Sequence, residues 1–278
     1  MTNSPSITLV LGGTGKAGSR LATELAKRGL GVRTAARNGA DVHFDWDDDT
    51  THRPALLGVD RLYLVPAVMR MDFAGQVATF LDLAEKAGVR HDTYLSAYGI
   101  DQAPPQVALR AVELDLFGRG GLTHSILRPA WFMQNFSETF LQPIDGAITV
   151  PTADGAEAFI DVGDIAAVAA ETLANPDAHA GAAYALTGPE AITMSEAAEI
   201  IGRVIGKPVR HHDIDRDVWI QGTVAAGVPA EYGEMLRMLT ETIASGTGSR
   251  PNDNVQAVTG APPITFVDFA RRTAQAWT

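Results

Sequence analysis

A short apolar run that breaks into glycines and then opens a helical pattern constrains the fold of this chain more than any other feature. The run is Ile7–Leu11, which predicts a buried strand. The residues that follow it are Gly12, Gly13, Thr14, Gly15, Lys16, Ala17 and Gly18. Either of the first two glycines can form the tight turn, Gly15 lets a ligand approach the backbone, and Gly18 allows the helix to pack closely on the strand.

The first backbone N–H groups of the helix after this turn have no partner within the helix, and they lie at the positive end of its dipole. A strand, a glycine turn and a helix in this order therefore predict a site for the pyrophosphate of a dinucleotide. A glycine-rich turn that binds nothing is the alternative. A nucleoside-triphosphate loop does not fit, because its spacing requires a glycine where the chain has Val10 and a hydroxyl where it has Ala17.

Length and composition set broad limits on the fold. With 278 residues, 46% of them hydrophobic and 20% charged, the chain is long enough for one large globular domain, alone or with a smaller appendage. The net charge of −11, without a cluster of Lys or Arg, argues against a nucleic-acid partner. The chain has no cysteine, which excludes disulfides, thiolate nucleophiles and sulfur-ligated metals.

The sequence also lacks the patterns of secretion and membrane insertion. The segment Met1–Ser6 has no basic stretch followed by an apolar core, as a secretory signal would have. No run of about eighteen apolar residues predicts a membrane span. We therefore expect a soluble protein of the cytoplasm.

The first half of the chain alternates strand patterns with helical patterns. Strands are expected at Ile7–Leu11, Val32–Ala36, Val42–Phe44, Arg61–Pro66, Thr93–Ser96 and Thr123–Arg128. Helices are expected at Lys16–Arg28, Phe73–Ala87 and Val107–Arg119. This alternation predicts an α/β fold, a Rossmann-type doubly wound parallel sheet with right-handed crossovers.

The rhythm changes after about residue 140. Further strands are expected at Phe159–Asp161, Ala183–Leu186 and Val209–Asp213. Further helices are expected at Val162–Ala174, from a capping box at Thr193–Glu196 to Ile205, and at Val218–Ala226, Ala230–Ser245 and Phe266–Trp277. We expect a dinucleotide-binding domain over residues 1–145 and a smaller C-terminal substrate-binding lobe over residues 146–278, with some segments returning to the main sheet.

The end of the second strand distinguishes the two pyridine dinucleotides. NAD sites of this type have an acidic residue there to accept the ribose hydroxyl, whereas this chain has Arg37. A guanidinium fork suits a 2′-phosphate, so we predict NADP(H), with Lys16 as a second positive charge. Asp41 is a weaker, acidic candidate. Asp45 and Trp46 follow the third strand and either border the adenine or form a turn with a partly buried ring.

Several segments of the chain are similar to those of a known family. Besides the glycine turn, they are Phe44–Trp46, Tyr63–Pro66, Tyr94–Gly99, Leu127–Phe136, Phe159–Ala166 and Leu186–Pro189. On these residues the chain resembles the NmrA-like atypical short-chain dehydrogenases, most of all the reductases related to fungal ergot-alkaloid synthesis and the quinone oxidoreductase-like group. The resemblance covers nearly the whole chain and implies a Rossmann fold, NAD(P)H binding, and either hydride transfer or cofactor sensing.

The catalytic residues of ordinary short-chain dehydrogenases have no counterpart here. Their Tyr-x-x-x-Lys pair is absent, because no lysine of this chain follows a tyrosine by four positions. Many atypical relatives instead carry His or Lys four residues before a glutamate, where this chain has Leu109 and Glu113. We expect Glu113 to be a carboxylate on the helix surface or one with a structural role.

Without that acid, we expect hydride transfer to a carbon that is already electrophilic. An iminium needs no proton donor, whereas a ketone develops charge on oxygen and needs one. We predict an NADPH-dependent reductase of a small imine, iminium, enone, quinone or ketone. The alternative is a non-catalytic NAD(P)-binding redox sensor of the NmrA type. An epimerase of nucleotide sugars is a weaker third candidate, because those relatives keep Tyr-x-x-x-Lys.

The residues that follow the strands supply the rest of the predicted site. The predicted catalytic residues are Tyr98, as a proton donor, and Ser96. Predicted cofactor contacts besides the glycine turn are Arg37, Asp45, Trp46, Pro66, Ala67, Val68, Ser96 and Pro129. Predicted substrate contacts are Met69, Tyr98, Trp131, Phe132, Met133 and Asn135. A core position is the alternative for each of the aromatic residues.

Other polar groups predict no metal site. The seven histidines have no metal-ligand spacing, and the adjacent His211 and His212 face opposite sides of an extended strand. Asp47–Asp49 is expected to be a solvated turn, and Asp161 and Asp164 are expected to cap the helix that begins near residue 162. The predicted partners are a small-molecule substrate and, in the assembly, a second copy of the chain.

Overall fold

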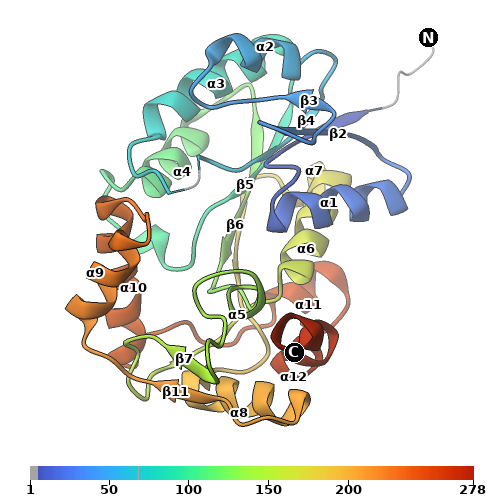
Figure 1. Ribbon diagram of the computed structural model, residues 1–278. Helices are drawn as coiled ribbons and strands as arrows, with labels where there is room; N and C mark the ends of the chain where they lie inside the picture. The colour runs from blue at the N-terminus through green and yellow to red at the C-terminus, as the bar shows by residue number, and fades with distance from the viewer. Residues whose placement is uncertain (1–5, 68) are drawn as a thin grey trace.

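The computed structural model describes residues 6–67 and 69–278, and Figure 1 shows their arrangement. The segment examined for a secretory signal, apart from Ser6, and the predicted cofactor contact Val68 lie outside the described residues. A sheet of seven strands lies at the centre, in the order β3-β2-β1-β4-β5-β6-β9. Its strands are β1 (Ile7–Leu11), β2 (Gly31–Ala36), β3 (Val42–His43), β4 (Arg61–Leu64), β5 (His91–Leu95), β6 (Thr123–Pro129) and β9 (Ala182–Leu186).

Every pair of neighbouring strands in this sheet is parallel. After β3 the chain passes over β1 and continues on its other side with β4, so the order of strands reverses between β1 and β4. This is the doubly wound Rossmann arrangement, and the predicted fold class is confirmed.

Two layers of helices cover the two faces of the sheet (Figure 1). Successive side chains of a strand point to opposite faces, so Leu9 and Leu11 pack in one core and Val10 packs in the other. The first core lies under α2 (His52–Ala55), α3 (Ala74–Ala87) and α4 (Ala108–Gly118). The second lies under α1 (Lys16–Lys27), α6 (Val162–Ala174) and α11 (Asn254–Thr259).

Most of the chain after β6 forms a smaller group of elements, here called the second lobe, which lies below the sheet in Figure 1. It contains α5 (Asn135–Glu138), β7 (Ala147–Thr149), β8 (Ala156–Glu157), β10 (Ile192–Thr193), α8 (Met194–Ile205), β11 (Arg210–His212), α9 (Arg216–Ala225), α10 (Ala230–Ala244) and α12 (Phe266–Thr273). Strand β7 pairs with β11 in parallel, and β8 pairs with β10 in antiparallel orientation. The intervening α6, α7 (Pro176–His179) and β9 return to the main sheet.

Short 3-10 helices are found at η1 (Asp49–Thr51), η2 (Ile100–Gln102) and η3 (Ala274–Trp277). The predicted capping box is present at the start of α8, where the Thr193 hydroxyl accepts the Glu196 N–H at 3.1 Å and the Glu196 carboxylate accepts the Thr193 N–H at 2.8 Å. In the part of the chain that the structure describes, no helix combines the length and the hydropathy needed to cross a membrane.

Two predictions for the second half were wrong. The strand expected at Phe159–Asp161 lies three residues earlier, at β8, because Ile160 bonds instead to the backbone of Trp131 and Met133. The side chain of Asp161 caps α6 as expected, by accepting the Gly163 N–H at 2.7 Å. Asp164 does not cap this helix, because its carboxylate turns inward and accepts the Ile264 N–H at 2.8 Å.

Candidate cofactor and substrate site

The glycine turn has the geometry that lets a ligand approach the protein backbone closely. Gly12 is the turn residue, with a φ of +62° that side-chain-bearing residues rarely adopt. A Cβ on Gly18 would lie 2.2 Å from the Gly12 carbonyl oxygen, so only glycine lets α1 start this close to β1. Both roles agree with those predicted from the sequence.

The amino end of α1 carries backbone donors without a side-chain cap. Gly15 is the N-cap residue and supplies no capping group, while Thr14 and Gly15 are exposed. An uncapped helix terminus of this kind is suited to a phosphate.

The two predicted phosphate cations lie apart. Arg37 directly follows β2 and is exposed, and among the described residues no carboxylate lies within ion-pair distance of it. The Lys16 ammonium instead donates to Asn135 Oδ1 at 3.3 Å and Thr139 Oγ1 at 3.1 Å, beyond the end of β6. Burial lowers the pKa of Lys16. The geometry therefore separates Lys16 from the end of β2, where the sequence analysis expected its charge.

The acidic candidates near the cofactor have structural partners. The Asp41 carboxylate accepts the backbone and hydroxyl hydrogens of Thr34, both at 2.8 Å, and these bonds hold its pKa below the usual range. The Asp45 carboxylate accepts the N–H of Asp47 at 3.1 Å. The Trp46 ring packs edge-on against two phenylalanines, and its indole N–H donates to the Val65 carbonyl at 3.3 Å. Their contact with an adenine stays a prediction.

A cavity of about 470 Å³ lies beyond the carboxyl ends of β4, β5 and β6. It adjoins the glycine turn, because Val65 lines it and the Val65 Cβ lies 3.9 Å from the place a Cβ on Gly12 would take. The predicted site residues that line it are Pro66, Ala67, Met69, Ser96, Tyr98, Pro129, Trp131, Phe132 and Asn135. Nine of the predicted site residues therefore lie in the wall of this cavity that the strand ends form.

Met133 does not line the cavity, contrary to the prediction. Its N–H donates to the Ile160 carbonyl at 2.8 Å, and its side chain, 1% exposed, packs in the core of the second lobe. Trp131 and Phe132 line the cavity, whereas the side chain of the next residue, Met133, packs in the core of the second lobe before α5 begins. A run of adjacent apolar residues cannot all face one space.

The opposite wall was missed by the sequence analysis. It consists of residues of α10, of the loop 247–249 and of β8, including Tyr232, Met235, Met238, Leu239, Thr242, Ser249 and Glu157. In Figure 1, α10 lies below α4 and beside α9, far along the chain from the strand ends that it faces. The apolar face of α10 was visible in the sequence, but nothing local to it indicated what that face covers.

Ser96 is held by a buried ionic cluster. Its hydroxyl donates to Glu113 Oε1 at 2.7 Å, and the same carboxylate binds the guanidinium of Arg128 through two bonds of 2.9 and 2.8 Å. Arg110 adds a third cationic bond at 2.9 Å. Glu113 is 0% exposed, so its expected place on the helix surface was wrong and its structural role is correct. The Ser96 hydroxyl can therefore accept a hydrogen bond from a molecule in the cavity but cannot donate one.

Tyr98 is the predicted proton donor, and its side chain is 37% exposed. It follows β5, and its backbone N–H bonds to the Pro129 carbonyl at 2.9 Å. Its phenol oxygen accepts only a long bond, 3.5 Å, from the Arg250 N–H. The phenol hydrogen therefore remains available on the cavity side, unlike the hydrogen of Ser96.

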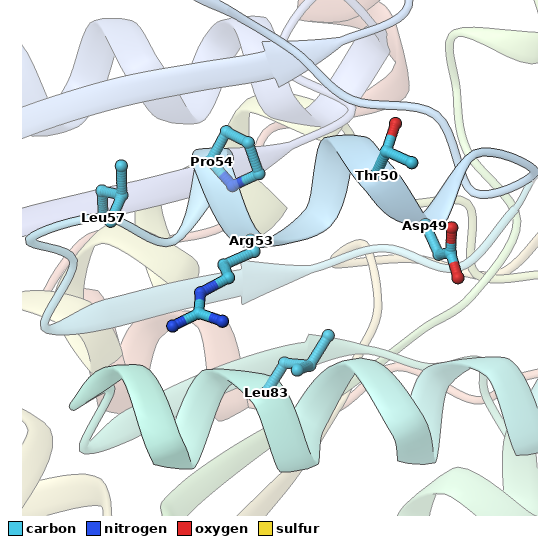
Figure 2. A pocket seen from close by; sticks show the side chains of 6 residues that line it. All are labelled: Asp49, Thr50, Arg53, Pro54, Leu57 and Leu83. Carbon is cyan, nitrogen blue, oxygen red and sulfur yellow. The ribbon is translucent and has the colours of Figure 1, made fainter.

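A second hollow, of about 560 Å³, is open to solvent between η1–α2 and α3. Figure 2 shows its six lining residues, with Arg53 extending from α2 toward Leu83 of α3. No residue of the sheet's carboxyl edge lines this hollow, and its polar groups do not converge, so we assign it no role. Within residues 6–67 and 69–278, no group of three or more acidic or histidine side chains could hold a metal ion.

A doubly wound sheet with a glycine turn in its first crossover and an apolar cavity at its strand ends defines a Rossmann-type α/β protein with a site for a small molecule. A model of the NmrA-like family matches residues 119–260. The chain is 36% identical to the uncharacterized oxidoreductase YesF of Bacillus subtilis (strain 168), over 97% of this chain and 96% of that protein. It is 31% identical to agroclavine dehydrogenase of Claviceps fusiformis, over 97% and 98% of the two chains.

The fold is also similar to that of a crystallised reductase. Triphenylmethane reductase of Citrobacter sp., solved in complex with NADP(H), superimposes with a TM-score of 0.75 at 22% identity, over 97% of this chain and 99% of that one. The chain belongs to the NmrA-like family and, with these relatives, to its oxidoreductases. The family inferred from the sequence motifs is confirmed.

Proposed function

We propose that this protein is an NADPH-dependent reductase that transfers hydride to a small, largely apolar organic molecule. The observation that carries the proposal is the cavity itself, which adjoins the glycine turn and is walled by aromatic, aliphatic and methionine side chains from both parts of the chain. A regulator that only senses a dinucleotide has no need of such a space beside the turn. The second lobe, which we propose to be substrate-binding from about residue 146, provides α10 and β8 to this wall.

The residues present fit a phosphorylated dinucleotide. The uncapped N–H groups at the start of α1 would hold the pyrophosphate, and Gly12 and Gly18 leave the room that its approach needs. Arg37, exposed at the end of β2, would bind the 2′-phosphate. The NADP(H) complex of the Citrobacter reductase supports this choice of nucleotide. When bound, the cofactor supplies the hydride.

The side chains at the cavity favour substrates that need little acid catalysis. The Ser96 hydroxyl donates its hydrogen bond to Glu113, so it can accept a hydrogen bond from a substrate but not donate one. Tyr98 has its phenol hydrogen available, yet no lysine follows it by four positions as in the Tyr-x-x-x-Lys pair. The walls therefore mainly orient the acceptor carbon and exclude water. An iminium, an enone or a quinone suits this set better than an unactivated ketone.

The test is NADPH oxidation by purified protein, followed by absorbance, with a cyclic iminium, an enone, a quinone and a ketone. We expect turnover with at least one of the first three, and Tyr98→Phe to reduce iminium turnover by less than about threefold, because an iminium needs no proton. Tight NADPH binding without turnover of any of them would instead favour the redox sensor. A homodimer, a location in the cytoplasm and the absence of a nucleic-acid partner remain predictions, the last supported by the net charge of −11.

A further inference from the structure

Glu157 is a buried carboxylate in the wall of an otherwise apolar cavity. It lies on β8, is 3% exposed and is the one acidic side chain among the described residues that line the cavity. Within the described chain, no Lys, Arg or His lies within ion-pair distance of it. A buried charge without a partner is costly, so its presence beside a cavity requires an explanation.

The hydrogen bonds at Glu157 are those of an ionised carboxylate. Oε2 accepts the Ser249 N–H at 2.8 Å, and Oε1 accepts the Ser249 hydroxyl at 2.5 Å and the Trp131 N–H at 3.5 Å. The Ser249 oxygen itself accepts the Ala158 N–H, which directs its own hydrogen to Glu157. Burial raises the pKa of Glu157, and the three donors act against that rise.

The loop that brings these donors is built to approach the carboxylate closely. A Cβ on Gly248 would lie 2.6 Å from Glu157 Oε2 and 2.5 Å from the Ala156 carbonyl oxygen. A residue with a side chain at this position would push the loop away and remove Ser249 from Glu157. The carboxylate is thus solvated by fixed dipoles, but its charge is not neutralised.

Among the described residues that line the cavity, no cation is left without a carboxylate partner. Arg70 is the one cationic side chain among the described lining residues, and it is paired with Asp47 at 2.5 Å and Asp72 at 3.4 Å. Aromatic faces, which attract cations, are provided by Tyr98, Trp131, Phe140 and Tyr232. One uncompensated negative charge among aromatic and methionine side chains is complementary to an apolar cation.

We propose that Glu157 is the counter-charge for a cationic ligand, so that the cavity takes an organic cation such as a cyclic iminium in preference to a neutral molecule of the same shape. This inference rests on the proposed function and names the substrate class of that site. Ser249 and the Trp131 N–H are positioning groups, whose hydrogen bonds favour the ionised carboxylate and hold it in the cavity wall.

The experiment compares two bicyclic probes of similar size. The first is 2-methyl-3,4-dihydroisoquinolinium, a permanent cation, and the second is 1-tetralone, which is neutral. Their dissociation constants are measured by calorimetry, with and without NADP⁺, so that no hydride transfer occurs. We expect the wild-type protein to bind the cation at least about 30-fold more tightly than the ketone, because only the cation can form a buried ion pair with Glu157.

Two variants locate that preference. Glu157→Gln keeps the shape and removes the charge, and we expect the preference for the cation to fall below about threefold while tetralone binding is unchanged. Glu190→Gln removes one negative charge from an exposed position away from the cavity, and it should keep the full preference. A preference retained in Glu157→Gln, or an equal weakening of both probes, would mean that Glu157 only anchors the loop and would overturn the proposal.

The wild-type measurement decides the matter even if Glu157→Gln does not fold, since equal affinities for the two probes would also overturn the proposal. Its failure is distinct from a failure of the proposed function. Turnover of neutral quinones with no preference for the cation would leave a reductase without this specificity. Charge-dependent binding without NADPH oxidation would support the cation site and contradict the proposed reductase activity.

Discussion

The two sides of the proposed site are specified in different ways. The proposed cofactor side is formed mainly by the backbone of seven consecutive residues, 12–18, where glycines such as Gly12 and Gly18 take positions that a side chain would not allow. The substrate side is formed by side chains from segments that lie between residues 65 and 249, and it depends on buried charges such as Glu113 and Glu157. The comparison teaches that a site made of the backbone of consecutive residues can be predicted from a short stretch of sequence. A site made of side chains from distant segments cannot, because only folding brings those segments together.

The largest expected effect tests the dependence of the substrate side on buried charge. Glu113→Ala removes the carboxylate that binds Arg110 and leaves Arg128 only the longer contact with Asp101 at 3.7 Å, and we expect a loss of about 3–5 kcal/mol in the free energy of unfolding. Urea denaturation measures it. Asp82→Ala, which removes an exposed partner of Arg119, is the control and should cost less than about 1 kcal/mol. Similar losses in the two variants would break the comparison.

The next effect tests the dependence of the cofactor side on the backbone. In Gly18→Ala the new Cβ meets the Gly12 carbonyl oxygen, and we expect about 3 kcal/mol of destabilisation and at least about 100-fold weaker NADPH binding. Gly75→Ala places a Cβ in open space within α3 and should instead stabilise the protein by about 0.5–1 kcal/mol. Thermal unfolding and fluorescence titration give both quantities. Unchanged NADPH affinity in Gly18→Ala would contradict the backbone-made site.

A third effect concerns the junction of the two parts, where Asp164 of α6 accepts the Ile264 N–H. Burial raises the pKa of Asp164 to about 7. The carboxyl group of Asp164 therefore stays protonated in the folded chain at pH values where it is already ionised in the unfolded chain, whose carboxyl pKa is near 4. Stability should therefore fall as the pH rises, by about 2 kcal/mol between pH 5 and 7. Urea denaturation of Asp164→Asn should lack this contribution, and parallel curves for the two proteins would refute it.

The smallest effect sharpens the choice of nucleotide. Arg37→Asp should weaken NADPH binding by about tenfold and leave NADH binding within about threefold, because only NADPH carries the 2′-phosphate. Arg53→Asp, which changes the charge in the outer hollow of Figure 2, should alter neither affinity. Titration of all three proteins with both nucleotides measures this. Equal losses for NADH and NADPH in Arg37→Asp would assign the residue a general electrostatic role instead.

The sequence predicted the fold well where a pattern is local. The α6 helix has the predicted bounds, and all seven strands of the main sheet were expected within a few residues. The predicted strand at Arg61–Pro66 stops two residues early, at Leu64, since a proline has no N–H for the ladder. These elements depend on periodicity and turn residues, which neighbouring residues determine.

The substrate side was predicted only in part, for a physical reason. Ser96 and Trp131 were found because parallel strands end at one edge of the sheet. Glu157 was not found, because its partner Ser249 lies 92 residues away in the sequence and neither residue stands out in its own segment. Glu113 was expected either on the helix surface or in a structural role, and what buries it is Arg128 of β6, which lies 15 residues away on another element. Such contacts arise from the fold, which no window of sequence contains.

The return of β9 to the main sheet has a consequence for folding during synthesis. Strand β6 ends at Pro129, but its outer neighbour begins only at Ala182, after the first elements of the second lobe. On the ribosome, β6 therefore presents a bare edge until more than fifty further residues have emerged, and α6 arrives over the sheet just before β9 does. An exposed edge invites pairing with other chains. We therefore expect a chain truncated between β6 and β9 to expose this edge and to aggregate more readily than the whole chain.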